Sequence, residues 1–172
     1  MTRAFLGLGS NLDDRRAILR SAVRGLGDDL RAVSGLYETD PVGGPEQGPF
    51  LNLVVELDTT DDPEALLARC HALEQAAGRE RTIRWGPRTL DVDILWIDGV
   101  ELDTPTLQVP HPRMFERRFV VAPLAELAPE LVPTGWQDVA TGNVHRLGDL
   151  FEPTPGGDAP ACDHEKHGER LA

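Results

Sequence analysis

Four strand-like runs and two amphipathic helical stretches follow one another in the order β-α-β-β-α-β, which predicts an α+β fold of the ferredoxin-like kind. In such a fold, both helices pack on one face of a mainly antiparallel sheet. The chain has 172 residues, 40% of them hydrophobic, which is enough to build the core of one domain. We therefore expect a single domain over residues 1–152, in which a hairpin and a mainly helical C-terminal segment extend the ferredoxin-like core.

The first half of the chain supplies three strands and the first helix. Ala4–Leu8 is a short apolar run, and the turn and capping residues at 9–11 lead into a helix that extends to about Leu26. The apolar positions of this helix recur with the spacing of one buried face: Ile18, Leu19, Ala22, Val23 and Leu26. The next strands are expected at 32–39 and 50–58, and the Gly- and Pro-rich residues between them predict a functional loop.

The second helix and the fourth strand follow. Asp62 before Pro63 is a typical helix start, and Gly78 is expected to end the helix. The apolar stripe of this helix consists of Leu66, Leu67, Cys70, Leu73 and Ala77. The fourth strand covers residues 90–97, and a tight turn at 98–99 leads from it into the hairpin.

Charge and composition argue against several classes of protein. The formal net charge of -12 repels nucleic acids and anionic lipids at long range. No apolar run is long enough to span a bilayer, and two cysteines cannot form a disulfide framework. We therefore expect a cytoplasmic monomer without nucleic-acid or membrane partners. The ferredoxin-like sheet also occurs in RNA-binding proteins, but the acidity and the absence of an aromatic RNA-binding motif disfavour that alternative.

The tail at 153–172 combines turn-forming residues and mixed charge with almost no apolar residues, so we expect it to be disordered. Cys162, His164 and His167 could hold a metal ion together, but three ligands on such a tail fall short of a closed four-ligand site. The globular domain is therefore expected to end near residue 152.

Two carboxylates stand out in the fourth strand. Because side chains alternate along a strand, Asp91 and Asp93 are expected on one face, together with Leu95 and Ile97. The opposite face is expected to carry Leu90, Val92, Ile94 and Trp96. A strand that is apolar on both faces is typical of the centre of a sheet. Because Mg²⁺ is commonly held by one or two carboxylates and the phosphates of a substrate, the pair is a candidate magnesium site. Ordinary solvated acids are the alternative.

Basic residues gather just before this strand. Within ten residues, this acidic chain places Arg79, Arg81, Arg84 and Arg88. Guanidinium groups match phosphate oxygens two at a time, so such a cluster beside two carboxylates indicates a phosphate ligand and a metal. A second basic segment could close over a polyphosphate from the far side with His111, Arg113, Arg117 and Arg118. A solvated basic loop is the alternative, and the sequence has no P-loop or dinucleotide-binding motif.

Four short motifs resemble the 6-hydroxymethyl-7,8-dihydropterin pyrophosphokinases of folate biosynthesis. They are GSNL at 9–12, FLN at 50–52, RWGPRTLDVDIL at 84–95 and VPHPR at 109–113, and the resemblance covers about Arg3 to Pro133. It implies that the diphosphoryl group of ATP is transferred to the hydroxymethyl group of the pterin and that AMP is released. It also implies that Asp91 and Asp93 bind two Mg²⁺ ions, with ATP and the pterin as the small-molecule partners.

The same resemblance assigns further residues. Around ATP it places His71, Glu74, Arg81, Trp85, Arg88, His111 and Arg117. Arg79 and Arg81 would lie on a mobile loop that closes during catalysis, and with Arg88 they form the implied catalytic set. For the pterin it implies the backbone from Thr39 to Val42 and the side chains of Phe50, Asn52 and Phe119.

Alternatives stay open at this point. Phe50 and Phe119 could be ordinary core residues, and a backbone group could satisfy the amide of Asn52 as well as a pterin could. Gln108, Pro112 and a loop one residue shorter before Trp85 depart from the family pattern, which affects the adenine side. A different magnesium-dependent phosphoryl or nucleotidyl transferase, with another acceptor, is the alternative enzyme.

Overall fold

The computed structural model describes residues 1–41, 46–78 and 89–152. At its centre lies a six-stranded sheet with the strand order β5-β1-β4-β3-β8, in which β2 also pairs with β4, and all paired strands are antiparallel. The strands are β1 (Thr2–Ser10), β2 (Leu30–Val33), β3 (Gly35–Thr39), β4 (Phe50–Thr59), β5 (Asp91–Ile97) and β8 (Val144–Asp149). The expected α+β, ferredoxin-like architecture is confirmed.

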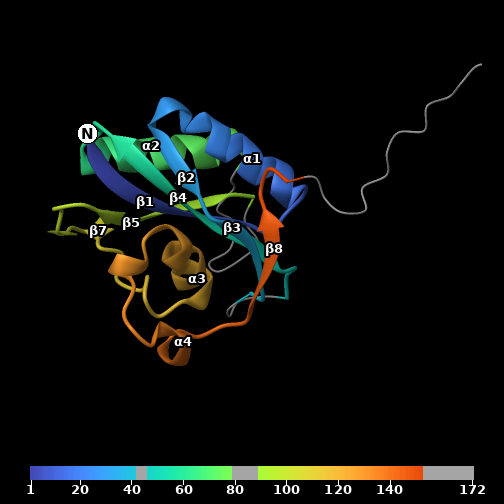
Figure 1. Ribbon diagram of the computed structural model, residues 1–172. Coiled ribbons are helices and arrows are strands. Elements are labelled where there is room, and N and C mark those ends of the chain that lie inside the picture. The colour runs from blue at the N-terminus through green and yellow to red at the C-terminus, as the bar shows by residue number, and fades with distance from the viewer. Residues whose placement is uncertain (42–45, 79–88, 153–172) are drawn as a thin grey trace, which may run out of the picture.

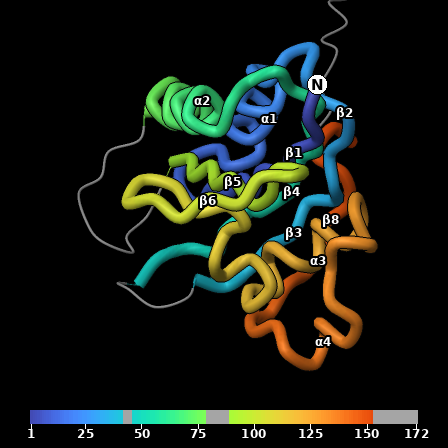
Figure 2. The backbone as a smooth tube through the Cα atoms, turned by 90° about the vertical axis from the view of Figure 1, so that its left-hand side faces the viewer, coloured from blue at the N-terminus to red at the C-terminus, as the bar shows by residue number. Residues whose placement is uncertain are grey.

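Helices cover both faces of this sheet (Figure 1). The two predicted helices, α1 (Arg15–Gly25) and α2 (Pro63–Ala76), lie on one face, as the ferredoxin-like pattern requires. On the other face lies α3 (Arg118–Leu127), followed by the short helix α4 (Trp136–Val139). Figure 2 shows the same three layers from the side, with the sheet between α1 and α2 above it and α3 below it.

Both predicted helices begin at capping aspartates, Asp62 as expected for α2 and, for α1, Asp14 rather than a residue at 9–11. The Oδ1 atom of Asp62 accepts a hydrogen bond from the backbone N–H of Ala65 at 2.8 Å. In the same way, Oδ1 of Asp14 accepts from Ala17 N–H at 3.0 Å, so α1 begins at Arg15. Such a bond satisfies one of the N–H groups that a helix leaves without a partner in its first turn.

Each face of the sheet has its own hydrophobic core. The core beneath α1 and α2 includes Leu6, Leu8, Leu19, Val23, Leu53, Val55, Leu66, Cys70, Val92 and Ile94. The core beneath α3 consists of Phe5, Val54, Leu95, Met114, Val120, Leu124 and Ala128. The central strands are therefore buried on both faces, although the sheet is antiparallel.

The predicted strand at 32–39 is in fact two strands, β2 and β3, which are separated at Ser34. The backbone N–H of Ser34 donates to the Val54 carbonyl at 2.9 Å, and the Ser34 hydroxyl accepts from the Val54 N–H at 2.9 Å. A serine side chain thus takes over a hydrogen bond that would otherwise join two backbones. Such side-chain competition interrupts regular structure without changing the hydrophobic pattern.

The expectation that 90–97 forms a central strand with regular alternation is wrong in two respects. Strand β5 lies at the edge of the sheet, and both of its faces are apolar because helices cover both sides. The pairing of β5 with β1 also shifts between Phe5 and Leu6, so one extra residue of β5, Leu95, lies at a bulge. As a result, Ile97 joins the core beneath α1 and α2, and Trp96 packs against the core beneath α3.

The hairpin that was expected directly after residues 98–99 forms further along the chain. The turn at 98–99 is present, with a hydrogen bond from Val100 N–H to the Ile97 carbonyl at 3.1 Å, but the chain beyond it does not pair with β5. Instead, β6 (Leu102–Asp103) and β7 (Gln108–Val109) form a separate two-stranded sheet.

The C-terminal segment is helical as expected, except that it ends in the strand β8, which the sequence did not predict. Most of β8 is exposed, so it lacks the apolar alternation that identifies a strand. It adds to the free edge of β3. Within the described ranges, no helix has the length and apolar character needed to cross a membrane. The tail at 153–172 lies outside the described residues, and the domain boundary near 152 stays a prediction.

Candidate functional site

Two cavities meet at Asp91 and Asp93 of β5, which line both of them. The α3-side cavity has a volume of about 160 Å³ and lies between the sheet and α3. The α2-side cavity has a volume of about 320 Å³ and is bounded by α2, β5 and the residues around β7. Because a cavity of about 150 Å³ holds one small aromatic ring, the α3-side cavity has the size for a compact flat ligand.

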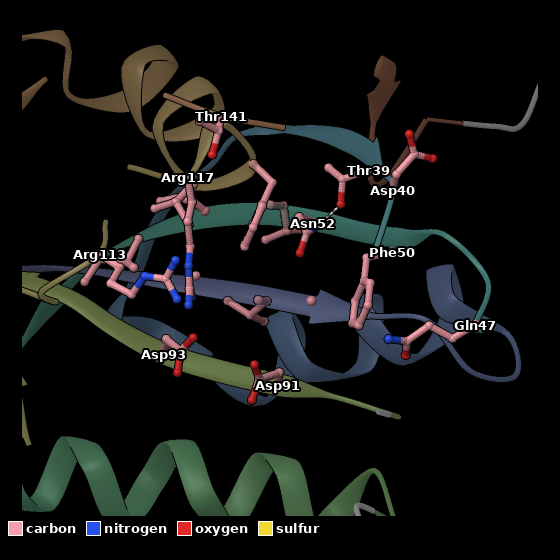
Figure 3. Close-up of a pocket in the computed structure, with 18 residues that line it drawn as sticks. Thr39, Asp40, Gln47, Phe50, Asn52, Asp91, Asp93, Arg113, Arg117 and Thr141 are labelled. Atoms are coloured by element: carbon pink, nitrogen blue, oxygen red, sulfur yellow. Dashed lines mark hydrogen bonds between the residues drawn. The ribbon is translucent and has the colours of Figure 1, made fainter. Parts of the chain in front are cut away.

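Strand pairing explains why the two carboxylates face open space. Asp91 lies opposite Gly9 of β1, and Asp93 lies opposite Gly7. Glycine has no side chain that could fill the space beside each acid. The prediction that Asp91 and Asp93 share one face is confirmed, and both side chains are half-buried at the shared wall (Figure 3).

Aromatic and amide side chains from the predicted pterin set gather in the α3-side cavity. Phe50, Asn52 and Phe119 all line it, as does Thr39. Asn52 is buried, and its Nδ2 atom donates to the Thr39 hydroxyl at 2.7 Å (Figure 3). The hydroxyl of Thr39, rather than a backbone group, thus accepts this hydrogen bond from the Asn52 amide. Val42, the remaining member of the predicted set, lies outside the described residues.

The wall that faces the acids is cationic. Arg113 and Arg117 both line the α3-side cavity, and Figure 3 shows their guanidinium groups close together across from Asp93. The Arg117 guanidinium also lies over the Phe119 ring, 5.8 Å from its centroid. Burial, and then the charge of Arg113, lower the pKa of Arg117, whereas the charges of Asp93 and Asp91 act in the opposite direction.

Arg118, which was predicted to close over a polyphosphate, has a different role. Its guanidinium donates to the carbonyls of Gln137 at 2.6 Å and Gly142 at 3.2 Å. These bonds, with that from the Arg118 N–H to the Thr141 carbonyl at 2.9 Å, fix the residues after α4 against the start of α3. The prediction for Arg118 is therefore wrong, because its guanidinium is hydrogen-bonded to backbone carbonyls.

The α2-side cavity contains three of the residues predicted around ATP: His71, Glu74 and His111. Glu74 is buried, and its Oε1 atom accepts from the backbone N–H of Val92 at 2.9 Å, which ties α2 to β5. Gln108 and Pro112, the two departures from the family pattern, line this cavity as well. Arg117 was assigned to the same group, but the structure places it in the α3-side cavity.

His111 is a neutral imidazole at neutral pH. Burial lowers its pKa, and the charges of Arg117 and Arg113 lower it further, while Asp91 acts in the opposite direction. Its Nδ1 atom accepts a hydrogen bond from the Arg113 backbone N–H at 3.1 Å. In the neutral ring the proton is therefore on Nε2, which can donate to an anionic ligand.

Several predicted residues cannot be placed. Arg79, Arg81, Arg84, Trp85 and Arg88 all lie outside the described residues, as do Cys162, His164 and His167. Conversely, two polar residues that line the α3-side cavity were not predicted, Gln47 and Thr141, whereas Asp40, which also lines it, lies within the predicted stretch from Thr39 to Val42. Asp40 and Gln47 belong to the Gly- and Pro-rich connection that was predicted to be functional. No sequence pattern indicated Thr141, because it reaches the cavity through an isolated β-bridge with Arg117, which is distant in the sequence.

The chemistry of the donor set fits magnesium. Among the described residues there is no group of three or more His, Cys, Asp or Glu side chains that could hold a metal ion by themselves. Mg²⁺ does not need such a group, since it keeps several waters and commonly takes one or two carboxylates together with phosphate oxygens. Asp91 and Asp93 supply two carboxylates at a place where both cavities leave room for phosphates and water.

Solved structures share this fold at low sequence identity. Wild-type HPPK-DHPS of Plasmodium falciparum, crystallised with SDX-DHP, matches with a TM-score of 0.54 and 17% identity over 76% of this chain. A triple mutant of HPPK-DHPS from the same organism matches with a TM-score of 0.57 and 14% identity over 78% of this chain. The chain spans only 40% and 41% of those two proteins, respectively, and at this identity the likeness shows the fold alone.

Sequence comparison is more specific. The family model of 7,8-dihydro-6-hydroxymethylpterin-pyrophosphokinase matches residues 5–129. The 2-amino-4-hydroxy-6-hydroxymethyldihydropteridine pyrophosphokinase of Bacillus subtilis is 47% identical over 74% of this chain and 79% of its own length. The enzyme of the same name from Methylorubrum extorquens is 46% identical over 78% of this chain and 88% of its own length. The chain therefore belongs to the 7,8-dihydro-6-hydroxymethylpterin-pyrophosphokinase family, which transfers a diphosphoryl group from ATP to hydroxymethyldihydropterin in folate biosynthesis.

Proposed function

We propose that the α3-side cavity binds 6-hydroxymethyl-7,8-dihydropterin, that the α2-side cavity binds ATP, and that the diphosphoryl group passes between them beside Asp91 and Asp93. The observation that carries this proposal is that the same two carboxylates line both cavities. Donor and acceptor would then meet at the acids, as a direct transfer between two substrates requires.

On the acceptor side, the lining suits a flat polar heterocycle. Phe50 and Phe119 offer aromatic surface for a ring, and the buried amide of Asn52 offers polar groups for its edge. Thr39 holds that amide through the hydrogen bond at 2.7 Å. The backbone from Thr39 to Val42 would complete the pocket.

On the donor side, His71, Glu74 and His111 line the α2-side cavity and would surround ATP. By the family resemblance, Arg81, Trp85 and Arg88 would join them. Asp91 and Asp93 would hold two Mg²⁺ ions with the triphosphate. When bound, these ions neutralise charge on the phosphate oxygens and orient the triphosphate. Arg79, Arg81 and Arg88 would act as the catalytic arginines, the first two by closing over the phosphates and excluding water.

In the reaction, the pterin hydroxyl oxygen forms a bond to the β-phosphorus of ATP. The bond between the β-phosphorus and the oxygen that bridges to the α-phosphate breaks, AMP leaves with that oxygen, and the hydroxyl proton is released. Arg113 and Arg117 lie close to the acceptor, where negative charge arrives. Preorganised cations at such a position favour the transfer, because they need no rearrangement during the reaction.

Product identification with labelled ATP tests the proposal. The purified chain, Mg²⁺ and the pterin alcohol should convert ATP labelled in the β-phosphate into labelled pterin diphosphate and unlabelled AMP. Omission of either the pterin or Mg²⁺ should abolish AMP release. Formation of ADP would instead indicate transfer of the γ-phosphate alone, and the absence of AMP under complete conditions would refute the proposed activity.

The chain is further proposed to act as a cytoplasmic monomer whose partners are the two small-molecule substrates, without nucleic acid or membrane. The formal net charge of -12 supports the absence of nucleic-acid and anionic-membrane partners, because it disfavours polyanions. Sedimentation at micromolar concentration should give the mass of one chain. Salt-sensitive retention on an RNA column would contradict the absence of nucleic-acid partners.

A further inference from the structure

Arg113 belongs to neither of the substrate-binding sets that the family resemblance assigns, yet its guanidinium lies at the wall of the α3-side cavity beside that of Arg117 (Figure 3). Both arginines line the α3-side cavity, whereas the described lining of the α2-side cavity includes neither of them. The acids Asp91 and Asp93 form the opposite wall. The cationic pair thus faces the acceptor rather than the nucleotide.

Two like charges at one wall repel each other, and partial burial strengthens the repulsion. Within the described part of the chain, the side chain of Arg117 makes no hydrogen bond or ion pair, apart from its position over the Phe119 ring. The Arg113 guanidinium makes one such contact there, from Nε to Oε2 of Glu116 at 3.2 Å. Most of the donors of the two guanidinium groups are therefore available to an anion in the cavity.

We propose that Arg113, together with Arg117, binds the diphosphoryl group on the acceptor side, so that it contributes to the affinity for the pterin diphosphate product. This inference rests on the proposed assignment of the α3-side cavity to the pterin. The pterin alcohol brings no negative charge to this wall, whereas its diphosphate places two phosphates beside the ring. Charge-assisted, bidentate bonds from the two arginines are therefore available to the diphosphate product and not to the alcohol.

Equilibrium binding to the full-length chain in the presence of Mg²⁺ tests the proposal with three probes: the pterin alcohol, the pterin diphosphate and α,β-methylene-ATP. In Arg113→Gln, the Kd for the pterin diphosphate should rise by about ten- to a hundredfold, the range expected for the loss of hydrogen bonds to a charged group. The Kd values for the alcohol and for the ATP analogue should change less than about threefold. Arg113→Lys should recover part of the affinity, because it keeps the charge without the planar fork.

Two matched controls separate the contact with phosphate from other effects. Glu116→Gln removes the ion-pair partner of Arg113 and should leave the affinity for the diphosphate unchanged or higher. Arg31→Gln removes an equal charge near Asp58, away from both cavities, and should change none of the three Kd values.

AMP release by the wild-type protein and diphosphate binding by Arg113→Gln test the proposed activity and the role of Arg113 separately. If wild-type protein releases no AMP, the proposed activity is refuted. If it releases AMP but Arg113→Gln binds the diphosphate as tightly as wild type, the role of Arg113 is refuted alone. An equal loss of affinity for the alcohol and the diphosphate would also refute it, since the variant would then have damaged the pterin pocket.

Discussion

At the scale of single residues, the site depends on small side chains as much as on charged ones. A Cβ atom added at Gly9 would lie 2.6 Å from Oδ1 of Asn52, a separation that requires the amide to move. At Gly7, a Cβ atom would meet Leu95 at 3.5 Å, which is an ordinary contact. Gly9 and Gly7 lie opposite Asp91 and Asp93, so neighbouring residues of β1 control both the room beside the acids and the position of Asn52.

A Gly9→Ala substitution should therefore weaken pterin binding selectively. The displaced Asn52 amide would lose its alignment with Thr39, and we expect about a tenfold rise in the Kd of the pterin with little change in that of an ATP analogue. Calorimetric titration of each ligand measures both. Gly7→Ala is the matched comparison and should have the smaller effect on the pterin. Equal effects of the two substitutions would contradict this account.

Asp93→Ala should reduce turnover by a thousandfold or more, on the order of 4 kcal/mol of transition-state stabilisation. The acid lines both cavities, and under the proposed mechanism its loss would remove a metal ligand from the place where the two substrates meet. Steady-state kinetics of AMP release measures the loss, and thermal unfolding should show little change in stability. Asp58→Ala, at the far end of β4, removes an equal charge and should keep normal turnover. Near-normal turnover of Asp93→Ala would exclude Asp93 from the metal site.

His111 should titrate below its ordinary pKa of 6.5, chiefly because it is buried and then because Arg117 and Arg113 are cationic. The unfolded chain then binds more protons between the lowered pKa and 6.5. The stability that neutral His111 contributes is present above pH 6.5 and declines as the pH falls through that window. NMR titration of the imidazole signals tests this, and Arg117→Gln should raise the midpoint. A wild-type midpoint at or above 6.5 would contradict it.

At the scale of elements, the predictable parts are those with a local signal. Helix α2 begins at Pro63 after an aspartate cap, as its sequence indicates, and β4 (Phe50–Thr59) matches its apolar run to within a residue. The bulge at Leu95 and the break at Ser34 were not predictable, because each depends on how a neighbouring strand pairs. Strand β8 was not predictable either, since its pairing with β3 is held by polar contacts.

Those polar contacts meet at Glu126 of α3. Its carboxylate accepts hydrogen bonds from the Tyr37 hydroxyl, from the Gly35 N–H at 2.8 Å and from Arg146 Nε at 3.0 Å. It therefore joins α3 to β3 and to the edge strand β8. Burial alone would raise the pKa of Glu126, but the hydrogen bonds from Tyr37, Arg146 and Gly35 outweigh it and lower the pKa.

Glu126→Gln should lower the free energy of unfolding by about 1–3 kcal/mol at pH 7, because it weakens charged hydrogen bonds to three partners. Since the carboxyl has a lowered pKa in the folded state, its contribution is present above about pH 4.5 and is lost as the pH falls below that value. Urea unfolding at pH 7 and pH 3 should show a smaller difference between the two pH values in the variant. Glu116→Gln, a more exposed carboxylate, should leave stability nearly unchanged.

At the scale of the whole molecule, this acidic protein places two arginines, Arg113 and Arg117, together at the wall of the α3-side cavity. The net charge of -12 does not indicate such a cationic wall, whereas the arginines of the second basic segment, at 111–118, do. The sequence motifs identified the two acids, the aromatic pair and Asn52 before any geometry was known. They could not show that Arg117 lines the α3-side cavity or that Arg118 holds the residues after α4, because both depend on how α3 packs against the sheet.

Removal of residues 153–172 should leave folding and activity intact. The described core ends with the buried Leu150, and Arg20 donates to its carbonyl at 2.9 Å. A chain that ends at Glu152 should keep the melting temperature and AMP release of the full chain. A chain that ends at Asp149 should melt at lower temperature, since it loses Leu150 and the contacts of Arg16 and Arg20 with that segment. Equal melting temperatures of the two truncated chains would contradict this boundary.

The acids at the wall between the cavities also constrain how such an enzyme can evolve. A substitution at Asp91 or Asp93 alters the lining of both cavities at once, so under the proposed assignment these positions couple the preferences for the two substrates. Residues that line only one of the two cavities, such as Gln108 and Pro112 on one side and Gln47 and Thr141 on the other, can change without altering the lining of the opposite cavity. A ligand that contacts only such residues would therefore occupy one cavity alone, whereas a ligand bound to Asp91 and Asp93 would block access to both.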